Sequence, residues 1–205
     1  MKYRQILDEL FGQKTKLKIL RYLVNKPIEQ SGRQIAKNIK IAHRNCHKVL
    51  QELHSLGILD MRRIGNADIY NLRKDHYLVK KVVKPLFNLE SKMLEELILE
   101  IKKIKLKDIV SIVLFGSISK GKEKPHSDID ILLIISKEEN KKDVEERIRE
   151  KNAYFISRFG NSLSPYLITG QEFIERYKKG DKLLKNIVKD GQIIFGKTFG
   201  EQITK

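Results

Sequence analysis

From residue 17 to residue 57, apolar residues recur every three or four positions, a spacing that predicts helices. The first predicted helix covers residues 17–24 and ends before Pro27, because proline cannot continue a helix. A second helix is expected over residues 33–40 after Ser31-Gly32, and a third over residues 42–57 with Gly57 as its stop. The third helix carries one apolar stripe, formed by Cys46, Val49, Leu50, Leu53 and Leu56, and its opposite face presents His43, Arg44, His47, Lys48 and Gln51.

Strand-like alternation replaces the helical spacing after residue 57. Residues 58–72 form two short runs around Gly65-Asn66, a pair that favours a two-residue hairpin turn. Three helices followed by a hairpin, with a basic face on the third helix, resemble the winged helix-turn-helix family over roughly residues 10–75. The resemblance implies that double-stranded DNA receives the third helix in its major groove, while the wing contacts the backbone. The implied DNA contacts are Arg44, Asn45, His47, Lys48, Gln51, Arg62 and Arg63.

The charge of the chain supports this interpretation of its first part. Residues 1–87 contain 19 Lys and Arg against 7 Asp and Glu, and they carry most of the net charge of +16. Such an excess is typical of a nucleic-acid binder. A lysine-rich solvated surface and a winged helix that binds protein are the alternatives. A metal site at His43, His47 and His54 with Cys46 is disfavoured, because Cys46 belongs to the apolar stripe.

Residues 76–107 contain no Gly and two apolar sets at helical spacing. We expect two helices here, broken near Pro85–Asn88, with Asn88 as the N-cap of the second. The expected domains are therefore a winged helix over residues 1–75, a helical connector over 76–107, and a second domain over 108–205 whose first helix starts near residue 90. An apolar helix between two domains favours a homodimer, and packing of that helix on its own domain is the alternative.

Two apolar runs in the second half, residues 109–115 and 129–135, are typical of buried strands. Gly116-Ser117 follows the first run, and Asp128 and Asp130 open the second. Alternate side chains of a strand share a face, so the two carboxylates should lie side by side, where a hard cation such as Mg²⁺ or Mn²⁺ would relieve their repulsion. A glycine that allows close backbone approach, a serine hydroxyl and helix-start amides suit phosphate groups.

A strand that ends in Gly-Ser, ten further residues and then Asp-x-Asp resemble the nucleotidyltransferase domain of the DNA polymerase beta superfamily. The resemblance is in particular to the small minimal nucleotidyltransferases, and it covers about residues 90–200. It implies metal-dependent transfer of a nucleoside monophosphate from ATP or another nucleoside triphosphate, with pyrophosphate released. The implied catalytic and metal residues are Asp128 and Asp130, and the implied nucleotide-binding residues are Gly116, Ser117, Lys120 and Lys122.

The sequence departs from that family at one position. A third carboxylate is expected on the strand after the next helix, and residues 161–171, which read as that strand, contain no Asp or Glu. Ser164 or Tyr166 stands in its place, Pro165 indicates an edge strand, and Glu172 just beyond is a candidate substitute. The pattern therefore favours nucleotide binding more strongly than turnover. The structural alternative is that Asp128 and Asp130 only cap loops.

The predicted fold class is α+β: a winged helix, a helical connector and a nucleotidyltransferase-like domain with a small mixed sheet. Two classes of function fit it. One is an enzyme that transfers a nucleotide to a small molecule or to a protein acceptor, such as the toxin partner of a toxin–antitoxin pair. The other is a transcriptional regulator whose second domain is inactive and senses nucleotide or contacts protein. One cysteine, no long apolar run and no signal-like start favour a cytoplasmic protein that does not enter membranes.

Overall fold

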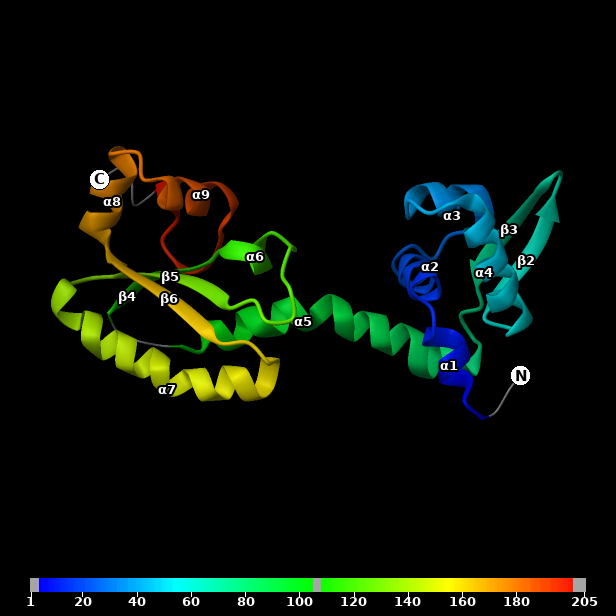
Figure 1. Ribbon diagram of the computed structural model, residues 1–205, viewed down its shortest axis with the longest axis horizontal. Coiled ribbons are helices and arrows are strands. Elements are labelled where there is room, and N and C mark those ends of the chain that lie inside the picture. Colours follow the sequence, from blue (N-terminus) through cyan, green and yellow to red (C-terminus); the bar gives the residue numbers. More distant parts are fainter. Residues whose placement is uncertain (1–3, 105–107, 201–205) are drawn as a thin grey trace. The chain divides into compact units, whose positions relative to one another are not determined.

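The computed structural model describes residues 4–104 and 108–200 of the chain. Its contacts divide the chain into two compact units, Met1–Met93 and Leu94–Lys205 (Figure 1). The division falls inside helix α5 (Lys84–Lys102), so part of the segment that the sequence assigned to a connector belongs to each unit. No helix within the described ranges is long and apolar enough to cross a membrane.

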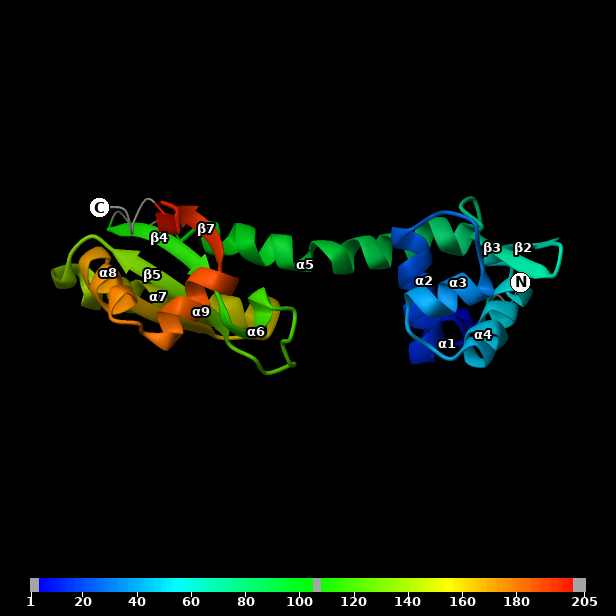
Figure 2. The same ribbon diagram turned by 90° about the horizontal axis from the view of Figure 1, so that it is seen from above.

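The first unit is a winged helix. Helices α2 (Lys14–Asn25), α3 (Gly32–Asn38) and α4 (His43–Ser55) match the three predicted helices (Figure 2). Strands β2 (Leu59–Ile64) and β3 (Ala67–Leu72) form the predicted hairpin. Its turn is Gly65-Asn66, because Ile64 pairs directly with Ala67, and Gly65 takes the positive φ of 56° that this turn needs.

Two elements of this unit were not expected from the sequence. Helix α1 (Ile6–Phe11) precedes α2, and strand β1 (Gln30–Ser31) pairs with β3, so the sheet has the order β1-β3-β2. A strand of two residues is too short to show alternation, which is why β1 was missed. Ser31 ends β1 and also caps α3 in a capping box with Gln34, which satisfies backbone donors at the start of that helix.

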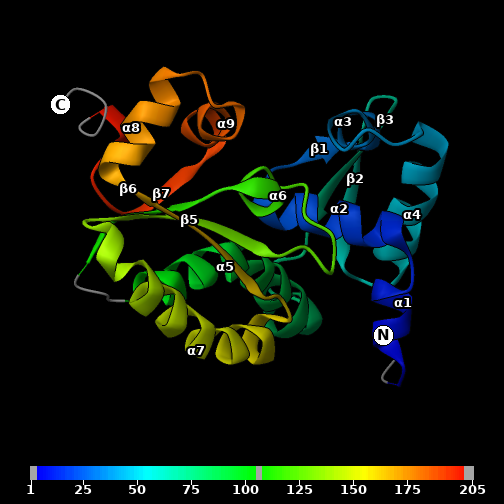
Figure 3. The ribbon, with the colours of Figure 1, turned by 60° about the vertical axis from the view of Figure 1, so that its left-hand side comes forward.

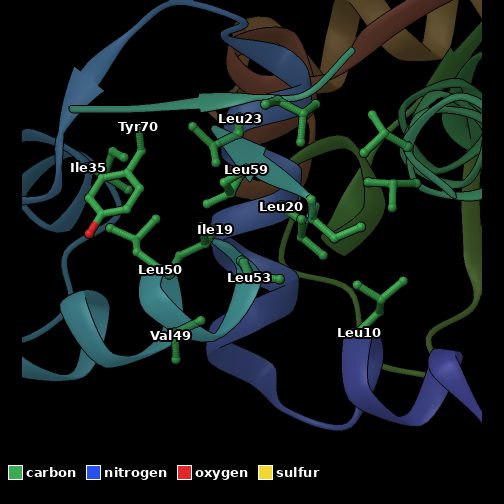
Figure 4. Close-up of a cluster of buried hydrophobic side chains, with 14 of the residues drawn as sticks. Leu10, Ile19, Leu20, Leu23, Ile35, Val49, Leu50, Leu53, Leu59 and Tyr70 are labelled. Carbon is green, nitrogen blue, oxygen red and sulfur yellow. The ribbon is translucent and has the colours of Figure 1, made fainter. Parts of the chain in front are cut away.

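The core of the first unit lies between α2, α4 and the sheet (Figure 4). Apolar positions of α2 and α4 face each other, and the ring of Tyr70 on β3 packs beside them. Close-packed side chains of this kind hold α4 at a fixed place on the unit, with its polar face outward. The labelled members of the core are Leu10, Ile19, Leu20, Leu23, Ile35, Val49, Leu50, Leu53, Leu59 and Tyr70.

The predicted break near Pro85–Asn88 is wrong. A π-helical turn, η1 (Val79–Val83), runs directly into α5, which passes through Pro85 and Asn88 without interruption. Proline inside a helix removes one backbone hydrogen bond and crowds the carbonyl four residues earlier. The wider π turn just before Pro85 accommodates this defect, as π-bulges do, so the helix continues instead of ending.

The second unit is a four-stranded mixed sheet with the strand order β6-β5-β4-β7. Strands β5 and β6 are parallel, whereas β4 pairs antiparallel with both β5 and β7. The strands are β4 (Ile109–Leu114), β5 (Ile129–Ile135), β6 (Leu163–Thr169) and β7 (Gln192–Gly196), and the helices are α6 (Gly116–Ser119), η2 (Glu138–Asn140), α7 (Lys141–Phe159), α8 (Gly170–Lys178) and α9 (Lys182–Asp190).

Helices cover both faces of this sheet (Figure 3). Helix α7 and the end of α5 pack on one face, against Ile129, Ile131 and the other side chains of β5 that point to that face. Helices α8 and α9 pack on the other face, against Leu132 and Ile134. Because side chains alternate along a strand, Asp130 lies on the face of α8 and α9. That face, at the end of the sheet where β5 begins, is the region of the predicted site.

Candidate functional site

Gly116 stands where β4 turns into the short helix α6, next to the start of β5 (Figure 1). The backbone N–H of Phe115 donates to the carbonyl of Asp130 at 3.0 Å, so the turn is tied to β5. Gly116 has φ +79°, and a Cβ added there would lie 1.9 Å from Oδ2 of Asp130. Only glycine fits this position, because its α-carbon lies against the Asp130 carboxylate.

The loop after Gly116 is organised by backbone hydrogen bonds to Ser117. The carbonyl of Ser117 accepts the N–H groups of Lys120 and Lys122 at 3.2 and 2.9 Å, and the Ser119 hydroxyl donates to the carbonyl of Gly116 at 3.2 Å. The ammonium of Lys120 pairs with Asp190 of α9 at 3.1 Å, whereas Lys122 is exposed on the loop. The two lysines of the predicted nucleotide site are therefore in different surroundings.

Asp128 and Asp130 lie on the same face of the sheet at the start of β5. Asp128 is exposed just before the strand, and Asp130 is half-buried as its second residue. Burial, and in second place the negative charge of Asp128, raises the pKa of Asp130 above its ordinary value. A divalent cation between the two carboxylates would relieve both effects.

The edge strand β6 and the residue just before it place two serines beside these carboxylates. Ser164 is paired in register with Asp130, so the two side chains lie on the same face of the sheet. Ser162 donates a hydrogen bond to Oδ1 of Asp128. The Asn161 amide donates to the carbonyl of Ser127 at 2.7 Å and so fixes the preceding loop. The sequence indicated Ser164 as a residue in place of the third acid, but not Ser162. The only indication of Ser162 in the sequence was that it lies two residues before Ser164.

Glu172 does not substitute for the missing acid. It lies in the first turn of α8, beyond the far end of β6, and its carboxylate pairs with Arg176 at 3.2 Å. Asp130 is in register with Ser164, five residues before Thr169 at the end of that strand. At about 3.3 Å per residue, this places Glu172 roughly 16 Å or more from the aspartates. The alternative interpretation of Glu172 as a helix-start residue is the one that fits its contacts.

The donor set fits a divalent cation that is shared with a ligand. Within residues 4–104 and 108–200, no group of three or more His, Cys, Asp or Glu side chains is placed to hold a metal. Two carboxylates at one strand start are nevertheless the number with which proteins commonly hold Mg²⁺ when phosphate oxygens and water complete the coordination. Asp128 and Asp130 therefore fit a metal that arrives with a nucleotide.

The polar face of α4 and the wing contain the predicted DNA contacts, and these residues differ in their exposure and in their hydrogen bonds. Arg44 and Lys48 are exposed. Gln51 is half-buried, and its amide donates to the hydroxyl of Tyr70 at 3.0 Å, so the fold itself uses this side chain. Among the other predicted contacts, Asn45 donates to Thr15 at 3.2 Å, His47 pairs with Asp68 at 3.7 Å, Arg62 pairs with Glu29, and Arg63 donates to the carbonyl of Gly65 at 3.4 Å.

Cys46 lies in the core of the first unit. It is fully buried, its thiol donates to the carbonyl of Gly32 at 3.7 Å, and burial raises its pKa to about 11. A thiol that ionises so reluctantly is a poor metal ligand. The rings of His43 and His47 lie 6.2 Å apart on the outer face of the same helix, which agrees with the assignment of Cys46 to the apolar stripe.

Comparison with known families gives the class of the second unit. Residues 94–194 match the model of a family described as "Nucleotidyltransferase domain". The chain therefore joins a winged-helix unit to a nucleotidyltransferase domain. A curated chain of Methanocaldococcus jannaschii, named "Putative protein adenylyltransferase MJ1305", is 36% identical over 86 residues, which are 39% of this chain. The matched part spans 58% of the length of that relative.

Two solved structures are also similar to parts of this chain. The AntR antimony-specific transcriptional repressor is 22% identical, with a TM-score of 0.37, over 45% of this chain and 77% of its own. A toxin–antitoxin structure with AMP-PNP is 19% identical, with a TM-score of 0.34, over 53% of this chain and 77% of its own.

Proposed function

We propose that this protein binds DNA through its winged helix and binds a nucleoside triphosphate with Mg²⁺ or Mn²⁺ through its nucleotidyltransferase domain. The observation that carries the proposal is the contact of Gly116 with the Asp130 carboxylate. It sets the phosphate-binding turn directly against the carboxylates that would hold the metal. Asp128 and Asp130 are the proposed metal ligands, and Ser117 with the backbone at Gly116 is the proposed phosphate cradle, assisted by Lys122.

The reaction that we propose at this site is transfer of a nucleoside monophosphate. An acceptor oxygen attacks the α-phosphorus, the bond from that phosphorus to the bridging oxygen breaks, and pyrophosphate leaves with that oxygen. The acceptor loses its proton to solvent, because Ser164 rather than a carboxylate stands beside Asp130. The relative from M. jannaschii, named as a protein adenylyltransferase, supports ATP as the donor and a protein as the acceptor.

The second candidate function is a regulator that binds the nucleotide without transferring it. Ser164 favours this candidate, because a serine hydroxyl in neutral water is a weak general base. Incubation with α-labelled ATP and Mg²⁺ separates the two. For an enzyme, we expect label on an acceptor with the wild type and none with Asp128→Ala/Asp130→Ala.

Ser164→Asp sharpens this experiment, since it puts a carboxylate next to Asp130 on the same face. We expect it to raise the rate of transfer about 100-fold, the usual range for one general base. Nucleotide binding without any label transfer, in both the wild type and Ser164→Asp, would establish the regulator instead. Ser157→Asp, at an exposed serine of α7 on the other face of the sheet, is the control for the added charge.

For the DNA-binding proposal, we predict that Arg44→Ala and Lys48→Ala weaken duplex binding. Each removes an exposed positive charge from α4. If each side chain contacts a phosphate, the slope of log affinity against log salt should become shallower by about one per variant. Fluorescence anisotropy with a labelled duplex at several salt concentrations measures this slope. Lys142→Ala, an exposed lysine of α7, should leave it unchanged, and no duplex binding by the wild type at low salt would refute the proposal.

We also propose a homodimer through α5. Leu86, Leu89 and Met93 are 42%, 56% and 60% exposed and follow one another at helical spacing within the first unit. A stripe of large exposed apolar side chains is typical of a helix that packs on a partner. Sedimentation should therefore give a dimer for the wild type and a monomer for Met93→Glu, whereas Lys92→Glu on the same helix should stay dimeric. A monomeric wild type would rule the proposal out.

A further inference from the structure

A cavity of about 160 Å³ opens beside Gly116, between α6 and α9. These two helices, far apart in the sequence, lie side by side in the second unit (Figure 2). The cavity adjoins the phosphate-binding turn on the side away from β6, since it is formed where β4 ends and β7 begins. Its walls are Phe115, Gly116, Ser119, Lys120, Leu183, Asn186, Ile187, Asp190 and Gly191.

The walls combine apolar surface with a few polar groups. Phe115, Leu183 and Ile187 supply the apolar part, and Leu183 is 41% exposed, so part of its side chain is open to a ligand. Asn186, on the same helix, brings one amide donor and one acceptor to the cavity. Apolar walls with few oriented polar groups are typical of small-molecule sites.

The Lys120–Asp190 ion pair joins the loop after α6 to the end of α9 at this cavity. The pair links the two walls, and in it the Lys120 ammonium is bound by a carboxylate of α9. A ligand here would thus meet Asn186 and the Lys120–Asp190 pair at its edge and the apolar side chains at its faces.

We propose that this cavity binds the purine base of the nucleotide whose phosphates lie at Gly116 and Ser117. The inference rests on the proposed function and extends it to the choice of nucleotide. A flat base suits the apolar walls, and the two rings of a purine cover more of them than the single ring of a pyrimidine. An asparagine amide also forms paired hydrogen bonds with a base edge that presents a donor and an acceptor side by side, as adenine does. Asn186 is the residue that recognises the base, and Leu183 covers one of its faces.

Calorimetric titration of the full chain, with Mg²⁺ present, tests the proposal with five probes: ATP, GTP, CTP, UTP and inorganic tripolyphosphate. The wild type should bind one or both purine nucleotides at least 10-fold more tightly than the pyrimidine nucleotides and tripolyphosphate. Asn186→Ala should weaken purine nucleotide binding about 10-fold, as expected for one lost paired contact to a base. It should leave tripolyphosphate affinity within about 2-fold, because the phosphate site is untouched.

Leu183→Ala is the second variant, and its exposed position makes a folding defect a poor explanation for any loss of binding. This variant should bind purine nucleotides more weakly than the wild type does, and its affinity for tripolyphosphate should be unchanged. Gln171→Ala, which removes an exposed amide from α8, is the matched control and should change neither. Equal affinity of the wild type for tripolyphosphate and for all four nucleotides would overturn the base site alone. Absence of binding by every probe would overturn the proposed function with it.

Discussion

Asp130→Asn should make the metal-free protein more stable at neutral pH and abolish its stabilisation by metal and nucleotide. Burial and the nearby charge of Asp128 raise the pKa of Asp130 in the folded state. The folded chain thus holds this proton more tightly than the unfolded chain, so stability from Asp130 is present at acid pH and is lost as the pH rises through its folded pKa. Above that pH, the ionised carboxylate costs stability, and the neutral amide of asparagine removes the cost.

Thermal unfolding of the wild type and of Asp130→Asn, with and without metal, measures both effects. Without metal, the melting temperature of the variant should exceed that of the wild type at pH 7. The difference should shrink as the pH falls, because Asp130 then becomes protonated in the wild type. Mg²⁺ with ATP at about 100 times the dissociation constant should raise the melting temperature of the wild type by about 5–10 °C. The melting temperature of the variant should not change.

Asp143→Asn is the matched control, since Asp143 is an exposed carboxylate on α7 that pairs with Arg147. It should gain no stability without metal and should respond to metal and ATP as the wild type does. If Asp130→Asn is destabilised at pH 7, then the ionised Asp130 does not carry the electrostatic cost. If metal and ATP still stabilise the variant, then Asp130 does not hold the metal.

The sequence predicted correctly those features that depend on residues close together in the chain. The turn at Gly65-Asn66 and the start of a helix at Ser31-Gly32 follow from the residues within a few positions, and both are present. The edge position of β6 also followed locally, because Pro165 cannot donate to a neighbouring strand. The helix break at Asn88 was wrong because the π turn before Pro85 leaves no signature in the hydrophobic spacing.

The arrangement around the aspartates depends on pairing between distant segments, which no local pattern reveals. The hydrogen bond from Ser162 to Asp128 requires the register of β6 on β5, and that register is set by the whole strand pair. The cavity beside Gly116 requires α9 to pack next to α6, about seventy residues earlier in the chain. The sequence could thus indicate that Gly116 and Asp130 serve one site, but not that one touches the other.

That contact gives the last prediction: Gly116→Ala should destabilise the protein and abolish nucleotide binding. Alanine at φ +79° costs about 1–2 kcal/mol, because the left-handed conformation crowds its Cβ. The new Cβ would also lie 1.9 Å from Oδ2 of Asp130, and relieving such an overlap costs about 1–3 kcal/mol more. Together these lower the melting temperature by about 5–15 °C. Asp130 must turn away to make room, so the metal and phosphate groups lose their common site.

A double-mutant cycle separates the two costs. In the background of Asp130→Ala, the carboxylate is gone and only the Cβ of residue 130 remains near the added methyl group, at 3.0 Å. Gly116→Ala should then cost only the conformational part, which leaves a coupling free energy of about 1–3 kcal/mol between the two positions. Gly160→Ala tests the conformational part alone, since Gly160 also has φ +79° and has no atom within 4 Å of an added Cβ. A coupling near zero would mean that Gly116 is needed for its backbone angle and not for its contact with Asp130.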